Sequence, residues 1–250
     1  MGGSVTFATE VGGRPYQQDR YVGIPFAGNG FNAWLLGVFD GHGDTAAVSE
    51  CCKKNLQSRV WPSELADPER FLRSVVAELV VATRYYSDGS TLSLALVVER
   101  EGSPKTVTVA ILGDSPVIVF DRAGKVRESP EHNIRSNPDE CQAVTDRGGN
   151  VRDGYVHIRF NFEYGLQLSR ALGDSYFNEI LSCEPDVYTI SDPTWILVAS
   201  DGIFDSDHAG DIPLVEIESF AKQGADADAI LEWADSYGLR DNATAIVWKS

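Results

Sequence analysis

Uninterrupted apolar runs define the predicted strands of this chain. Residues 34–39 carry four large apolar side chains and no charge, which is typical of a strand buried on both faces. The runs at 107–112 and 195–200 have the same character. Further strands are predicted at 92–98, 116–120 and 243–248 and near Leu166, and residues 121–124 are expected to form a hairpin turn.

Helices are predicted where apolar residues recur three and four positions apart. This spacing holds over 71–80, after Asp67-Pro68, which places proline at the first helical position. Other helices are expected over 45–60, 137–148 and 226–237, whereas 150–162 mixes charged and aromatic residues and predicts an irregular flap. Because strands and helices occur in clusters, the predicted fold class is α+β with antiparallel sheets rather than a doubly wound parallel fold.

The composition is typical of one soluble domain. The chain has 250 residues, of which 43% are hydrophobic, with no low-complexity tract, so we expect a single domain over 1–250. We find no secretory signal and no stretch that could cross a bilayer. The four cysteines form no C-x-x-C pair, which favours reduced thiols in a cytoplasmic or nuclear protein; they are Cys51, Cys52, Cys141 and Cys183.

The net charge narrows the choice of partners. Thirty-seven acidic and twenty-one basic residues give −16, which disfavours nucleic acid and anionic lipid. Met1-Gly2 with Thr6 fits the N-myristoylation pattern, although no basic patch follows to supply a second membrane anchor. We expect a monomer without a transmembrane segment.

Acidic residues stand at the tips of the predicted strands. Asp40 follows the run at 34–39, and Asp114 and Asp201 follow the next two runs, while Asp241 precedes the last strand. If that strand is antiparallel to its neighbours, its start lies beside their ends, and the four acids meet. Clustered carboxylates require a cation, and oxygen ligands favour Mg²⁺ or Mn²⁺. The alternative is that Asp40 caps the helix that follows it.

Seven short motifs follow one another along almost the whole chain. They are Arg14-Pro15-Tyr16-Gln17-Gln18-Asp19, Asp40-Gly41-His42-Gly43, Ser90-Thr91, Gly113-Asp114-Ser115, Leu168-Ser169-Arg170-Ala171-Leu172-Gly173-Asp174, Ala199-Ser200-Asp201-Gly202 and Asp241-Asn242-Ala243-Thr244. In this order they resemble the motif set of the metal-dependent protein phosphatases, the type 2C serine/threonine phosphatases.

The resemblance implies a four-layer αββα sandwich with two metal ions between its antiparallel sheets. It implies that Asp40 bridges both ions, that the Gly41 carbonyl binds one, and that Asp201 and Asp241 bind the other. Asp114, Asp201 and Asp205 match positions that hold a weaker third ion in some members. Asp19 matches an acid that acts through water, and Gln18 stands where members carry Glu or Gln.

The resemblance also implies the reaction and its substrates, phosphoserine and phosphothreonine in proteins. A hydroxide bridging two Mg²⁺ or Mn²⁺ ions attacks phosphorus in line, without a phosphoenzyme. Arg14 suits the phosphate because its planar guanidinium grips two oxygens. His42 is the candidate general acid, because imidazole titrates near working pH.

Other residues are expected to be structural, and the chain departs from the family at one point. We expect His132 and Ser169-Arg170 to serve as scaffold, and Asp174 and Asp186 to cap turns. The family usually has Arg after Gly-Asp-Ser, where this chain has Pro116, which leaves the support of Asp114 open. The flap before Leu166 and the segment from 205 to 241 are short for the family, and both are expected to shape substrate choice.

Two further functions are compatible with the sequence. The first is a catalytically silent relative that serves as a binding module or scaffold, in which metal ligands should be missing. The second is the same hydrolysis on a small phosphorylated metabolite. Asp40, Asp201 and Asp241 are all present, which favours the protein phosphatase.

Overall fold

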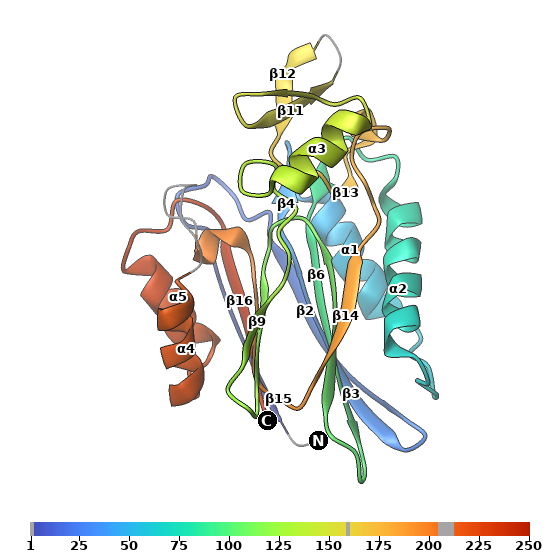
Figure 1. Cartoon of the computed structure of the whole chain (residues 1–250), viewed down its shortest axis with the longest axis vertical. Coiled ribbons are helices and arrows are strands. Elements are labelled where there is room, and N and C mark those ends of the chain that lie inside the picture. The colour runs from blue at the N-terminus through green and yellow to red at the C-terminus, as the bar shows by residue number, and fades with distance from the viewer. Residues whose placement is uncertain (1–2, 159–160, 205–212) are drawn as a thin grey trace.

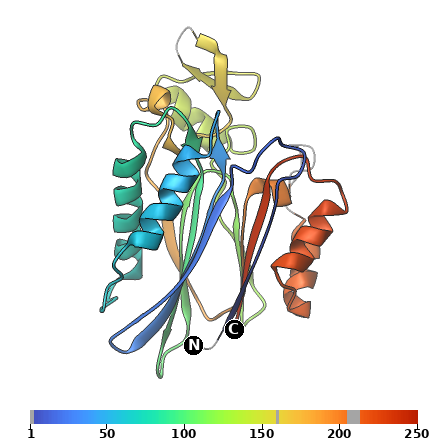
Figure 2. The same ribbon diagram turned by 180° about the vertical axis from the view of Figure 1, so that it is seen from behind.

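Two antiparallel five-stranded sheets face each other, and helices cover their outer faces (Figures 1 and 2). The computed structural model describes residues 3–158, 161–204 and 213–250. The layer order is helix, sheet, sheet, helix, so the predicted αββα sandwich is confirmed. No helix in these three ranges has both the length and the apolar character needed to span a membrane.

The sheets hold the strands in two separate sets. The first sheet has the order β1 (Ser4–Glu10), β16 (Ala243–Lys249), β15 (Pro193–Ala199), β8 (Val117–Asp121) and β9 (Val126–Glu128). The second has the order β14 (Asp186–Ser191), β7 (Thr106–Leu112), β6 (Leu92–Arg100), β3 (Phe31–Phe39) and β2 (Arg20–Gly28). Every neighbouring pair within them is antiparallel, as the clustering of elements predicted.

Each large sheet has its own helical cover. α1 (Ala47–Ser58) and α2 (Pro68–Thr83) lie on the second sheet, and α4 (Leu214–Gln223) and α5 (Ala227–Asp235) lie on the first (Figures 1 and 2). α2 starts as predicted, because Asp67 Oδ1 accepts the backbone N–H of Arg70 at 3.0 Å and Pro68 is the first helical residue. α4 is not among the helices predicted from the sequence.

The continuous apolar runs are explained by burial on both faces. In β3, Leu35 packs with the residues under α1 and α2, whereas Leu36 packs between the two sheets with Val109 and Ile196. Successive side chains point to opposite faces of a strand, and both faces here are covered. This double burial is why these strands lack the usual alternation of apolar and polar residues.

The predicted irregular flap is wrong, because this part of the chain forms a small sheet. β10 (Asn150–Arg152), β11 (Tyr155–Ile158) and β12 (Asn161–Leu166) pair antiparallel beside α3 (Pro138–Asp146) at one end of the molecule (Figure 1). A turn with positive φ at Asp153 and Gly154 joins the first two strands. β10 contains no fully buried residue and β11 buries only Val156, so the apolar pattern was too weak to predict them.

Candidate functional site

The acidic tips of the strands lie at one end of the sandwich. Asp40 follows β3, and Asp201 follows β15 as the first residue of a 3₁₀ turn, η2 (Asp201–Ile203). β16 runs antiparallel to β15, and the Ser200 N–H donates to the Thr244 carbonyl at 3.0 Å. The start of β16, and Asp241 just before it, therefore lie beside Asp201, as the antiparallel arrangement predicted.

A close backbone contact brings the two chain segments together. A Cβ atom on Gly202 would lie 2.0 Å from the carbonyl oxygen of Asn242, so only glycine permits this approach. The amide of Asn242 then anchors the N-terminal loop, since its Oδ1 accepts the Gln18 N–H at 2.7 Å and its Nδ2 donates to Val11 O at 2.9 Å. Asn242 stands in the last of the seven motifs, but no role was predicted for it from the sequence.

Asp40 and Asp201 are surrounded by other carboxylates. Burial, together with the nearby charges of Asp19, Asp201 and Asp114, holds the pKa of Asp40 well above its usual range. The pKa of Asp201 is raised in the same way, by burial and by Asp114 and Asp241. The predicted gathering of the four acids is therefore present, and Asp19 lies with them.

The chemistry of this cluster fits a hard divalent cation. The Asp19 side chain is buried, its Oδ2 accepts the Ser200 hydroxyl at 2.7 Å, and its Oδ1 has no hydrogen-bond partner. Gly41 lies in a cradle that a side chain would fill, because a Cβ atom would come within 2.8 Å of Gln18 O and 2.9 Å of Ser49 Oγ. Carboxylate and carbonyl oxygens are the ligands that Mg²⁺ and Mn²⁺ prefer.

The cluster is not a closed cage for an ion. Within residues 3–158, 161–204 and 213–250, no three His, Cys, Asp or Glu side chains are set to hold a metal by themselves. Asp205, one of the expected ligands, lies outside the described residues.

Arg14 lies at the edge of the acidic cluster. Its Nη2 donates to Asp241 Oδ2, and about half of its side chain is exposed. The Asp241 Oδ1 atom accepts the N–H of Asn242 at 2.7 Å. The guanidinium is thus beside the acids, at a position where it can meet an anion arriving from solvent.

His42 is paired with the carboxylate of Asp174, a contact that was not predicted from the sequence. Its Nε2 lies 2.8 Å from Asp174 Oδ2, and a three-stranded sheet of β13 (Leu172–Gly173), β5 (Gly89–Ser90) and β4 (Gly41–His42) places the two residues together. Burial would lower the pKa of His42, but the Asp174 carboxylate outweighs it and the pKa is raised. Asp174 does stand at the N-cap position of the 3₁₀ turn η1 (Ser175–Phe177), as predicted, but the prediction that its side chain caps this turn is wrong, because it makes no capping hydrogen bond there.

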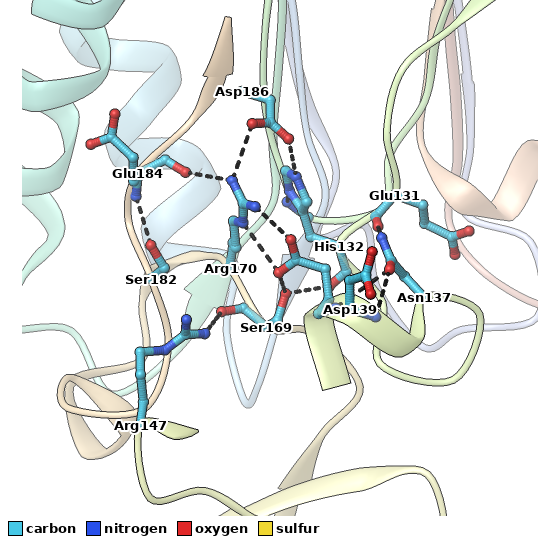
Figure 3. Close-up of polar contacts among 12 residues, drawn as sticks. Glu131, His132, Asn137, Asp139, Arg147, Ser169, Arg170, Ser182, Glu184 and Asp186 are labelled. Atoms are coloured by element: carbon cyan, nitrogen blue, oxygen red, sulfur yellow. Dashed lines mark hydrogen bonds and ion pairs between the residues drawn. The ribbon is translucent and has the colours of Figure 1, made fainter. Parts of the chain in front are cut away.

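The expected scaffold residues form a polar network beside the cluster (Figure 3). The Ser169 hydroxyl donates to Glu140, which also accepts two hydrogen bonds from Arg170, so Ser169 is not placed as a nucleophile. Asp186 contacts His132 and Arg170 instead of capping a turn, so that prediction is also wrong. The structural roles predicted for His132 and Ser169-Arg170 agree with these contacts. All four cysteines are free, as expected.

Comparison with known proteins identifies the family. The family model described as Protein phosphatase 2C matches residues 31–242. Two rice relatives, Probable protein phosphatase 2C 55 and Probable protein phosphatase 2C 40 of Oryza sativa subsp. japonica, are 29% and 30% identical. The alignments cover 96% and 90% of this chain but 64% and 51% of those relatives, so it spans less than two thirds of their length.

A solved structure agrees with the fold. The crystal structure of a phosphatase from a pathogenic strain of Toxoplasma gondii has a TM-score of 0.75 with 19% identity and covers 99% of this chain and 92% of that chain. At this identity the likeness supports the fold alone. Together with the family match over 31–242, these findings show that the chain belongs to the protein phosphatase 2C family.

Proposed function

We propose that this chain is a Mg²⁺- or Mn²⁺-dependent phosphatase acting on phosphoserine and phosphothreonine in proteins, with residues 1–250 as one catalytic domain. The observation that supports this most is the gathering of Asp40, Asp114 and Asp201 beside the buried Asp19. Carboxylates held this close repel one another unless a cation lies among them. Membership of the family adds the reaction class.

Apart from Asp205, which lies outside the described residues, the proposed ligands come from the ends of four strands, β3, β7, β15 and β16. Asp40, the Gly41 carbonyl, Asp201 and Asp241 would hold two ions, and Asp114 with Asp205 would take part in a weaker third site. When bound, the ions supply charge neutralisation and lower the pKa of water so that a hydroxide exists near neutral pH. The unpaired Asp19 Oδ1 is suited to accept a hydrogen bond from water in the site.

Arg14 and His42 would act directly on the substrate. The guanidinium of Arg14 can bind two phosphate oxygens at once, which orients the ester for attack by water. Because His42 Nε2 is held by Asp174, the proton for the departing serine or threonine oxygen would come from Nδ1. The new P–O bond forms to water, the ester P–O bond breaks, and the protein side chains form no bond to phosphorus.

The test is phosphate release from a phosphothreonine peptide with Mn²⁺, with Mg²⁺ and with EDTA. We expect activity with either ion and none with EDTA. Asp201→Asn should lower the rate by orders of magnitude and leave the fold intact, whereas Asp228→Asn, on the exposed side of α5, should match the parent. A folded protein without cation-dependent turnover would contradict the proposal and favour a silent binding module.

The same assay separates proteins from small molecules as substrates. The phosphopeptide is compared with a small aliphatic phosphate ester and an aryl phosphate at equal concentrations. A protein phosphatase should have the highest kcat/KM for the peptide. Faster turnover of the small aliphatic ester would favour a metabolite phosphatase, which uses the same chemistry on another substrate.

A further inference from the structure

A polar network joins α3 to the segment that precedes β13 (Figure 3). Arg170 holds Glu140 of α3 with two hydrogen bonds, from Nε at 3.2 Å and from Nη2 at 2.5 Å. Its Nη1 donates to the Glu184 carbonyl at 3.1 Å and lies 3.4 Å from Asp186 Oδ1. A bidentate pair of this kind has one favoured geometry, so it can fix the residues attached to it.

His132 extends this network to the turn that carries Asp114. Its Nε2 lies 2.9 Å from Asp186 Oδ2, and its Nδ1 accepts the backbone N–H of Gly113 at 3.1 Å. Because a backbone N–H can only donate, Nδ1 carries no proton and Nε2–H donates to Asp186. The His132 side chain is completely buried, and the backbone N–H of His132 donates to the Gly113 carbonyl at 3.0 Å.

The turn is also held from its other side. The Ser115 hydroxyl lies 2.8 Å from that of Thr91, and Ser93 Oγ donates to the Ser115 carbonyl at 2.5 Å. Gly113 has a φ of +103°, and a Cβ atom there would lie 2.7 Å from the Thr91 side chain. The backbone on both sides of Asp114 is therefore tightly constrained.

Asn133 fixes the Asp114 carboxylate itself. Its Nδ2 donates to Asp114 Oδ2 at 2.9 Å, and its Oδ1 accepts the backbone N–H of Arg135 at 3.0 Å. This second bond determines the orientation of the amide, because Oδ1 must face Arg135 and Nδ2 must then face Asp114. Asn133 is next to His132 in the chain, so the buried network also fixes its position.

We propose that Asn133 is a positioning residue that orients Asp114 toward a divalent cation, and that His132 and the Arg170–Glu140 pair hold it in place. The inference rests on the proposed function. The neighbouring Pro116 has no hydrogen-bond donor, and an Asn amide orients a carboxylate without neutralising it.

Mn²⁺ binding to the metal-free full chain, measured by isothermal titration calorimetry without substrate, tests this role. We expect Asn133→Ala to weaken the weakest Mn²⁺ event by about 10- to 100-fold, the usual effect of removing a partner of a metal ligand, and to leave tighter events unchanged. Ser136→Ala is the matched control, because Ser136 lies in the same loop and its hydroxyl contacts Asn133 O at 3.4 Å. An Asn133→Ala isotherm that superimposes on the parent's overturns the proposal.

A double-mutant cycle shows whether Asn133 acts through Asp114. In an Asp114→Ala background, Asn133→Ala should have no further effect on Mn²⁺ affinity. If Asn133→Ala lowers Mn²⁺ affinity further in this background, Asn133 has a general structural role and the proposal is overturned. The proposal is also overturned if Asp114→Ala leaves the weakest Mn²⁺ binding event unchanged. Phosphopeptide turnover by the parent protein is scored separately, so failure of the proposed function is distinguished from failure of this inference.

A measurement on the parent protein covers the case in which Asn133→Ala does not fold. In a ¹⁵N-labelled sample titrated with Mg²⁺, the side-chain NH₂ resonances of Asn133 should shift together with the weakest binding event. The side-chain NH₂ resonances of Asn55, which donates to Cys51 O on α1, should stay in place. Asn133 resonances that remain unmoved up to saturation overturn the proposal.

Discussion

His42 Nε2 lies 2.8 Å from Asp174 Oδ2, although 132 positions separate the two residues in the chain. Gly89 lies between them, and a Cβ atom there would come within 2.1 Å of both side chains. Asp174 itself adopts a left-handed backbone conformation with a φ of 49°. The pair therefore depends on the absence of a side chain at Gly89 and on the left-handed backbone of Asp174, and Nδ1 is the imidazole nitrogen that does not contact Asp174.

Asp174→Asn is expected to affect substrates according to their leaving group. The amide cannot stabilise a protonated His42, so transfer of a proton to the leaving oxygen should be impaired. We expect kcat for a phosphothreonine peptide to fall by about 100-fold and kcat for an aryl phosphate to fall much less. Steady-state kinetics on both substrates measure this, with the exposed Glu179→Gln as control. Equal losses on both would argue against His42 as the acid.

Arg14→Lys is expected to weaken phosphate recognition. A lysine ammonium replaces the planar fork with a single point charge, so kcat/KM for the phosphopeptide should fall by about 10-fold or more. Mn²⁺ affinity should not fall, because lysine keeps the single positive charge that Arg14 places beside Asp241. Kinetics and calorimetry provide the two readouts, with Arg84→Lys, which packs over Tyr85, as control. Unchanged kinetics would remove Arg14 from the phosphate site.

Mn²⁺ is expected to stabilise the folded chain. A ligand at 100 times its Kd adds about 2.7 kcal/mol, which raises the Tm of a 250-residue chain by about 5–10 °C. Asp201→Asn should reduce this rise, because one carboxylate of the cluster is then lost, whereas Asp228→Asn should preserve it. Differential scanning calorimetry with Mn²⁺ and with EDTA gives the comparison. A Tm that does not respond to Mn²⁺ would show that the acids bind no ion.

His132 is expected to make stability depend on pH. Burial lowers the pKa of His132 from the usual 6.5, so the unfolded chain binds a proton more readily than the folded one. The contribution of His132 to the free energy of unfolding is therefore fully present above pH 6.5 and is lost as the pH falls below 6.5 through the lower pKa of the folded chain. The stability difference between the parent and His132→Gln should shrink from pH 8 to pH 5.5, measured by urea unfolding. His157→Gln, on β11, serves as control, and a difference that stays constant with pH would contradict this assignment.

The central strands and the start of α2 could be predicted because their signals are local. Residues 34–39 are apolar throughout since β3 is buried on both faces, and Asp67 caps α2 through a bond to Arg70, three residues away. β10, β11 and α4 were missed for the opposite reason. β10 and β11 are short and bury few side chains, so they carry no long apolar pattern. α4 does carry apolar residues three and four positions apart, at Leu214, Ile217, Phe220 and Ala221, but this pattern covers only ten residues and includes one fully buried side chain, Ile217.

In the candidate site, too, some features could be predicted from the sequence and others depended on the tertiary structure. The sequence predicts which acids stand at the ends of the strands, because the end of an apolar run is a local feature. These acids are Asp40, Asp114, Asp201 and Asp241. Which side chains meet there was decided by the tertiary structure. Asp174 contacts His42, Asn133 donates a hydrogen bond to Asp114, and Asn242 binds the N-terminal loop. These hydrogen bonds join segments that are distant in the chain, and they produce no periodic pattern in the sequence from which they could be predicted.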